Sequence, residues 1–173
     1  MRLHWHRTDL RPSDNLSLVS PDADPILPVY VFDPRILEHA APPRVAFVLD
    51  SLAALREWYR DRESDLLVVR GEAPAALARL AEVYDADAVS WAQAYSGLGR
   101  RRDDRVAAEL ADAGVETRVV HDHLHHEPGS ITTNEGEPYS VYSYFWKKWK
   151  DREKRASASA PGADRLGTPR GET

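Results

Sequence analysis

The sequence predicts an α/β fold, a Rossmann-like three-layer α/β/α sandwich around a five-stranded parallel sheet. Short apolar runs, typical of strands buried on both faces, alternate with longer segments whose apolar residues recur every three or four positions. Parallel strands joined in this way need right-handed crossovers. At 173 residues, 42% of them hydrophobic, the chain is long enough for one such domain with a buried core.

Five segments have the composition of buried strands. The first contains Leu3 and Trp5 and ends abruptly in charged residues, followed by turn and helix-start residues at 12–15. Pro28 is expected to be the first residue of the second strand, because a proline inside a sheet removes a hydrogen-bond donor. The later strands are expected at 28–32, 66–69, 88–91 and 115–120.

Three amphipathic helices are expected between these strands, beginning at Pro43, at Pro74 and near Arg100. The apolar face of the first helix consists of Val45, Val48, Leu49, Leu52, Leu55 and Tyr59. The third helix is expected to follow a loop at 92–99 and to end at Gly114, which suits a C-cap.

This order of elements predicts a ligand-binding crevice at one edge of the sheet. The first and fourth strands are expected to lie side by side where the strand order reverses, so the loops after Trp5 and Trp91 would face each other there. The first strand is not followed by a glycine-rich dinucleotide or P-loop motif, so these two common site types lose their main support.

Arginines at two expected helix starts raise the question of an anionic ligand. Arg44 lies in the first turn of its helix, and Arg100, Arg101, Arg102 and Arg105 open another. Cations at a helix N-terminus oppose the helix dipole, whereas an anion there is stabilised. The alternative interpretation is that these arginines lie on a solvated helix face and form ion pairs within the helix with Asp103 and Asp104.

Composition excludes several classes of protein. A net charge of −5 argues against bulk electrostatic coating of nucleic acid. Without cysteine there is no disulfide, thiolate metal site or thiol nucleophile. No apolar run has the length of a membrane span and the N-terminus is unlike a signal peptide, so a cytoplasmic location is expected.

Two segments in the last third allow more than one interpretation. The histidines of HDHLHH at 121–126 could bind zinc or copper, but polar residues are expected at a strand end and no metal is assigned to them. The aromatic segment YSVYSYFWKKWK at 139–150 could stack nucleic-acid bases. Docking on the sheet domain or on a following domain is the favoured interpretation. Residues 151–173, poor in apolar side chains, are expected to be a linker or disordered tail after a domain at 1–150.

The segment WHRTDLRPSDN at 5–15 resembles the opening of DNA photolyases and cryptochromes. Similar segments follow in order at 27–37, 42–56, 66–73, 99–103, 121–131 and 137–149. The resemblance implies the amino-terminal α/β domain of that family, which holds a light-harvesting antenna pigment. The family's helical domain, which binds FAD and DNA, would be its partner and lies outside these residues. By this resemblance the chain alone neither binds FAD nor repairs DNA.

The resemblance also implies which residues bind the pigment. Arg44 matches the arginine that deazaflavin-type relatives direct at their pigment. The full expected set is Trp5, His6, Arg7, Asp9, Arg44, Trp91, Gln93 and Arg100. Several positions of the family's motifs, most of them polar, are replaced here by Thr8, Ala92, Ala94, Ser96, Gly97 and Leu98. These departures remove most of the polar contacts to a deazaflavin or a methenyl-folate, and a flavin antenna tolerates them best. FMN or a deazaflavin is therefore expected rather than a methenyl-folate, in a partly eroded site.

Two other functions are kept open. One is a cryptochrome-like light sensor with a protein partner, and the other is a stand-alone nucleotide-binding module that binds ATP or AMP. Self-association is a further expectation, because a face that the helical domain covers in relatives would be exposed.

Overall fold

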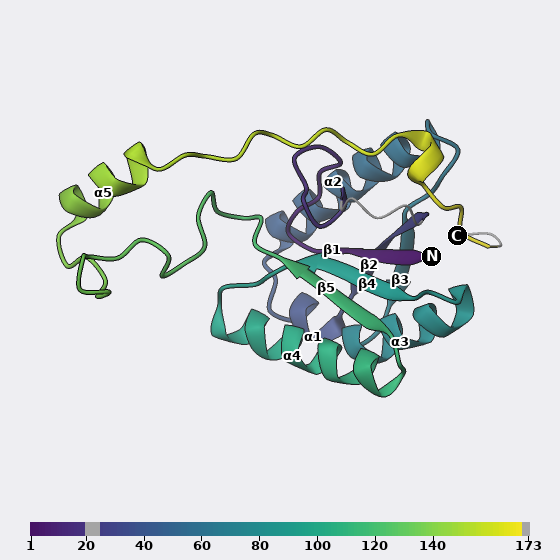
Figure 1. Cartoon of the computed structure of the whole chain (residues 1–173). Helices are drawn as coiled ribbons and strands as arrows, with labels where there is room; N and C mark the ends of the chain where they lie inside the picture. Colours follow the sequence, from purple (N-terminus) through teal and green to yellow (C-terminus); the bar gives the residue numbers. More distant parts are fainter. Residues whose placement is uncertain (20–24, 171–173) are drawn as a thin grey trace.

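The computed structural model describes residues 1–19 and 25–170 (Figure 1). All strand pairs are parallel, and the sheet order is β3-β2-β1-β4-β5. The predicted fold class is confirmed, and so is the adjacency of the first and fourth strands. The strands are β1 (Arg2–His6), β2 (Ile26–Phe32), β3 (Leu67–Arg70), β4 (Ala88–Ala92) and β5 (Glu116–Val120).

The three predicted helices are present as α2 (Pro42–Arg60), α3 (Ala73–Tyr84) and α4 (Gly97–Asp112). The structure adds three shorter elements, which are α1 (Pro34–Leu37), α5 (Tyr142–Asp151) and the 3-10 turn η1 (Ala163–Arg165). The expected start of α4 near Arg100 was wrong. The Ser96 side chain accepts a hydrogen bond from the Gly99 N–H at 3.1 Å, and this N-cap starts the helix at Gly97. Within the described residues, no helix is long and apolar enough to cross a membrane.

Helices cover both faces of the sheet (Figure 1). On one face, Leu3 and Trp5 of β1 belong to a core that α3 and α4 complete with residues such as Leu77 and Val106. On the other face, a smaller core forms around Leu52, Leu55, Tyr59 and Leu66, with Tyr30 and Phe32 of β2 packed against it. The alternation of side chains along each strand thus divides the interior into two unequal layers.

The central strand β1 buries polar side chains beneath α2. All five residues of β1 are buried, and Arg2, His4 and His6 alternate with the apolar Leu3 and Trp5. Such burial needs partners, and the Arg2 guanidinium donates hydrogen bonds to the carbonyls of residues 17 and 18. The α2 face of β1 is therefore a polar layer inside the domain.

An arm comprising residues 121–151 leads away from the sheet and carries α5 (Figure 1). The Trp149 ring packs edge-on against His125 and His126 of the same arm, and Trp146 stacks on Trp149 at 5.3 Å. Tyr142 remains 73% exposed. Docking of this helix on the sheet domain, one of the expected arrangements, was therefore wrong. Among the aromatic residues of the helix, Trp149 packs on the arm's own histidines.

After α5 the chain returns across the domain in an extended conformation (Figure 1). Arg155 contacts Asp14 and Asp122, and Leu166 forms an isolated β-bridge with Ile26. Ser64 donates a hydrogen bond to the carbonyl of residue 167 at 2.6 Å. The structure thus gives this segment specific contacts up to residue 170. The division into a domain at 1–150 and a linker at 151–173 stays a prediction, and residues 171–173 lie outside the described part.

Candidate functional site

The main candidate site is a cavity of about 550 Å³ at the carboxyl ends of β1 and β2. The first half of α2 covers it on one side, and α4 contributes one arginine from the other. Aromatic rings and three arginines dominate the lining, which includes Trp5, His6, Arg7, Thr8, Tyr30, Phe32, Asp33, Arg44, Phe47 and Arg102. Both the volume and the position at strand ends are typical of small-molecule sites in α/β proteins.

Arg7 occupies the place where the sequence predicted an open crevice. Its guanidinium donates a hydrogen bond to the Ala92 carbonyl and forms a largely buried ion pair with Asp103. These contacts tie the end of β1 to the end of β4 and to α4. The prediction of a crevice between the loops after the first and fourth strands was therefore wrong. The cavity lies on the β2 side of this bridge instead.

Trp5 forms the base of the cavity, with cations above it. The guanidinium carbons of Arg7 and Arg102 lie 4.8 and 5.2 Å from the Trp5 ring centre, within the range of cation–π attraction. Trp91 packs against Trp5 at 5.8 Å in an edge-to-face arrangement. Since Trp91 is fully buried, it supports the base without lining the cavity.

Arg102 carries the clearest sign of a missing partner. Its Nε atom is buried and has no hydrogen-bond partner among residues 1–19 and 25–170. Burial lowers the pKa of Arg102, and the nearby Arg7 lowers it further. Buried donors in folded proteins are normally satisfied, so a donor without a partner beside a cavity points to an external acceptor. A negatively charged group in the cavity would supply that acceptor.

Arg44 and Phe47 reach the cavity from the first two turns of α2. Two prolines begin this helix, so Arg44 falls in its first turn and lies where an anion is stabilised by the helix dipole. Phe47, one turn later, is 71% exposed. An exposed ring beside an exposed arginine is well placed to pack on a flat charged ligand.

Asp9 organises the loop after β1. Its carboxylate accepts hydrogen bonds from the Arg7 N–H at 2.9 Å and from the Asn15 side-chain amide at 3.3 Å. Burial raises the pKa of Asp9, but His6, His4 and the Arg7 N–H outweigh burial and lower it overall. The ionised carboxylate therefore holds the loop in place, next to the cavity.

The structure brings together half of the site residues expected from the sequence. Trp5, His6, Arg7 and Arg44 line the cavity, whereas Asp9 and Trp91 lie buried outside its lining. Gln93 donates its N–H to the Val120 carbonyl at 2.8 Å, and Arg100 is exposed on α4. The binding roles of all eight stay predictions.

Sequence reasoning missed Arg102, although a signal was present. Val106 and Leu110 are the buried apolar positions of α4. Arg102 precedes Val106 by four residues and therefore lies on the same helix face. Arg100 precedes Val106 by six residues and falls on another face. This spacing separates Arg102 from the exposed Arg100.

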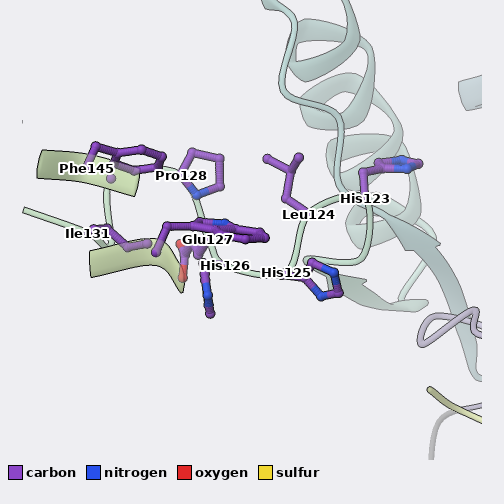
Figure 2. Close-up of a pocket in the computed structure, with 10 residues that line it drawn as sticks. His123, Leu124, His125, His126, Glu127, Pro128, Ile131 and Phe145 are labelled. Atoms are coloured by element: carbon purple, nitrogen blue, oxygen red, sulfur yellow. The ribbon is translucent and has the colours of Figure 1, made fainter. Parts of the chain in front are cut away.

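A second cavity of about 470 Å³ lies in the arm, between the loop at 123–131 and α5 (Figure 2). His123, His125 and His126 line it together with Phe145, but Figure 2 shows the three imidazoles pointing in different directions. His121 instead contacts the Tyr95 hydroxyl at 3.2 Å and Glu127 at 3.1 Å. Nothing in this run gathers ligand atoms around one point.

Comparison with known proteins assigns the family. A family model described as DNA photolyase matches residues 2–163. The chain belongs to the DNA photolyase family. It is 50% identical over 172 residues to a deoxyribodipyrimidine photo-lyase of Halobacterium salinarum, and the match covers 93% of this chain. It is also 34% identical over 180 residues to a cryptochrome DASH of Natronomonas pharaonis, with 98% of this chain and 37% of the relative covered.

Solved photolyase structures have the same fold. A bacterial class III photolyase from Agrobacterium tumefaciens superposes with a TM-score of 0.85 at 31% identity, covering 98% of this chain and 35% of that one. This chain likewise spans only 36% of the Halobacterium photo-lyase. The chain thus corresponds to the amino-terminal α/β domain of photolyases and spans about a third of the length of such relatives.

Proposed function

We propose that this domain is the light-harvesting part of a photolyase and binds a planar, negatively charged pigment in the 550 Å³ cavity. The observation that supports the proposal best is Arg102, which lies over the Trp5 ring with its buried Nε unpaired among the described residues. A flat ring would pack on the aromatic walls, and its anionic group would accept hydrogen bonds from the arginine.

The charge balance of the cavity supports an anion. Arg7 is already paired with Asp103, and Asp33 caps α1 and lies 3.4 Å from Arg35. Arg44 and Arg102 form no ion pair within the part of the chain that the structure describes. The cavity therefore carries an excess of positive charge.

FMN suits this arrangement better than a methenyl-folate does. It combines a flat isoalloxazine ring with a compact phosphate, and these match an aromatic wall and a pair of guanidinium groups. A deazaflavin shares the flat ring and remains the second choice. When bound, such a pigment would absorb light and pass excitation energy to the FAD of the helical domain.

The proposed partner is that helical FAD domain, through which the whole protein would bind DNA and split pyrimidine dimers. The curated photo-lyase relative is nearly three times as long as the matched region, which leaves room for such a domain. Within this proposal, the residues of the α/β domain bind and orient the pigment, and none of them takes part in dimer cleavage.

Titration with FMN tests the proposal. We expect saturable binding with quenching of the flavin fluorescence, because the ring would lie close to Trp5. Arg102→Ala and Arg44→Ala should each weaken binding about tenfold to hundredfold, the usual effect of losing a charge-assisted hydrogen bond. Arg100→Ala is the matched control, since this exposed arginine of the same helix lies outside the cavity, and it should leave the affinity unchanged.

Two results would contradict the proposal. The first is that FMN, a deazaflavin and a methenyl-folate all fail to bind. The second is that Arg100→Ala weakens binding while Arg102→Ala does not. Saturable binding of ATP or AMP without any flavin would favour a nucleotide-binding module.

A further inference from the structure

A second group of polar side chains lies inside the domain, beneath α2. His4 and His6 are two residues apart on β1 and therefore point to the same face, and Asp9 follows in the next loop. All three are buried, and one potential ligand atom from each lies within 4.8 Å of the other two. The two imidazole rings meet edge-to-face with centres 4.4 Å apart. We call this group the β1 cluster.

The hydrogen bonds of the β1 cluster define which ring nitrogens carry protons. We assign His4 the Nδ1–H tautomer, in which Ser90 donates its hydroxyl to the Leu3 carbonyl at 3.4 Å and its oxygen accepts from His4 Nδ1–H at 3.2 Å. His4 Nε2 then carries a lone pair, is fully buried and has no partner among the described residues. A buried acceptor without a donor is unusual in a folded protein.

His6 is held in the same tautomer. Its Nδ1–H donates to the Asp9 carbonyl at 3.1 Å, and its Nε2 accepts from the Tyr59 hydroxyl at 2.8 Å. Both histidines are thus neutral and present Nε2 lone pairs. This is the form in which imidazole binds metals, with the other ring nitrogen oriented by a hydrogen bond.

Asp9 adds a negative charge that forms no ion pair with a described lysine or arginine side chain. Its carboxylate accepts hydrogen bonds from one backbone N–H and one amide, but it forms no ion pair with a described lysine or arginine. A buried carboxylate is usually paired or coordinates a metal. The β1 cluster therefore combines a free lone pair on His4 Nε2, a second imidazole lone pair on His6 that accepts from Tyr59, and one carboxylate without an ion-pair partner.

We propose that His4, His6 and Asp9 bind a divalent transition metal of the zinc class. Two imidazole nitrogens and one carboxylate oxygen are a donor set that zinc accepts in proteins. The Tyr59 hydroxyl, next to His6, or a water would complete a four-coordinate site. Ser90 would act as the outer partner that orients His4.

The geometry requires a modest contraction. Ligand atoms about 2.0–2.1 Å from zinc lie about 3.4 Å from one another, so atoms of the β1 cluster that are up to 4.8 Å apart must approach by up to about 1.4 Å. Rotation of the two rings and of the Asp9 side chain can supply this movement. His6 also lines the cavity described above, which gives an ion a route from solvent.

Metal titration of the purified full chain, after treatment with a chelator, tests the site. Cobalt(II) chloride is the spectroscopic probe, and we expect the intense visible d–d absorption of a four-coordinate ion, saturating at one ion per chain. Zinc chloride should displace the cobalt and raise the melting temperature. His4→Phe, which fills a similar volume without a ligand, should abolish the spectrum and the thermal shift.

Two further variants separate this site from other histidines. His125→Ala/His126→Ala removes imidazoles of the exposed arm and should leave both signals unchanged. Ser90→Ala keeps all three ligands but loses the hydrogen bond to His4, and it should weaken binding about 10–100-fold. Circular dichroism of each variant checks that it is folded. X-ray absorption of the zinc-loaded wild type needs no variant. Its spectrum should show two imidazole ligands and oxygen ligands around the zinc.

Three outcomes would overturn the proposal. The first is that the wild type shows no saturable metal binding. The second is that the wild type and folded His4→Phe bind the metal equally. The third is an X-ray absorption spectrum of the zinc-loaded protein that shows three or more imidazole ligands. The last would locate the ion on the histidines of the arm. None of these results depends on pigment binding, so they leave the proposed function untouched.

Discussion

His4 is a titratable side chain at a buried position of a central strand. It lies on the central strand of the sheet, where an apolar side chain would serve packing equally well. Burial lowers the pKa of His4 well below its usual range, and the neighbouring His6 lowers it further. Burial also lowers the pKa of His6 and raises that of Tyr59. The interior beneath α2 thus holds titratable groups in their neutral forms.

Stability should therefore fall in mild acid. Below the pKa of about 6.5 that histidine has in the unfolded chain, the unfolded state binds protons that the folded state does not. The free energy of unfolding then decreases as the pH falls, by up to about 1.4 kcal/mol per pH unit for each buried histidine. His4→Phe should reduce the loss between pH 7 and pH 5 by about 1–2 kcal/mol.

Urea denaturation at both pH values, with a chelator present, measures this effect. The exposed His39 provides the control, and His39→Gln should show the same loss as the wild type. An equal loss in wild type and His4→Phe would mean that His4 is already protonated in the folded protein.

At the scale of elements, the start of α4 positions the arginines of the cavity. The helix begins at Gly97, so Arg102 lies in its second turn and reaches Trp5, while Asp103 reaches Arg7. Gly99 lies against the preceding loop, because a Cβ atom there would be 2.5 Å from the Ala94 Cβ. Close packing between the loop and the first turn therefore sets the position of the helix.

Alanine substitutions at the two glycines of this turn should have different effects. Gly99→Ala should destabilise the fold by about 1–3 kcal/mol, the usual cost of overpacking, and should weaken FMN binding by displacing Arg102. Gly97→Ala, whose Cβ would meet only the Arg101 side chain at 3.6 Å, should leave stability within about 1 kcal/mol or raise it. Thermal unfolding and FMN titration measure both effects. Equal stability of the two variants would show that the loop moves freely.

At the scale of the whole molecule, one buried carboxylate joins three distant parts of the chain. The Asp122 side chain is fully buried and accepts hydrogen bonds from Arg11 at 2.9 Å and Arg155 at 2.8 Å. Arg155 also binds Asp14, and this hydrogen bond lowers the pKa of the Asp14 carboxyl. The loop after β1, the segment after β5 and the returning chain are thus held together.

Removing Arg155 should loosen the returning chain. In Arg155→Ala, Asp122 keeps Arg11 but loses its second cation, which should cost about 1.5–3 kcal/mol. Hydrogen exchange should rise in residues 156–167 and stay unchanged in the sheet. Arg152→Ala is the control, because the side-chain hydrogen bonds described for Arg152 go only to the exposed Ser130 of the arm. Similar exchange in both variants would show that the extended segment is held by its contacts with β2 and Ser64 alone.

The sequence by itself determined the fold class, the strand order around β1 and the family. Alternating apolar runs and amphipathic helices are local patterns, and parallel pairing with right-handed crossovers leaves few arrangements for them. Trp5, His6, Arg7 and Arg44 could be expected near the strand ends, because the position of a residue after a strand or in a first helical turn is also a local property.

Only the tertiary structure decided which side chains meet. Arg7 and Asp103 are 96 residues apart, and their ion pair closes the expected crevice and moves the cavity toward β2. The selection of Arg102 over Arg100 depends on where α4 begins and which face it buries. The β1 cluster likewise needs α2 to bring Tyr59 over His6. Such contacts depend on packing between elements distant in sequence, and no local periodicity encodes them.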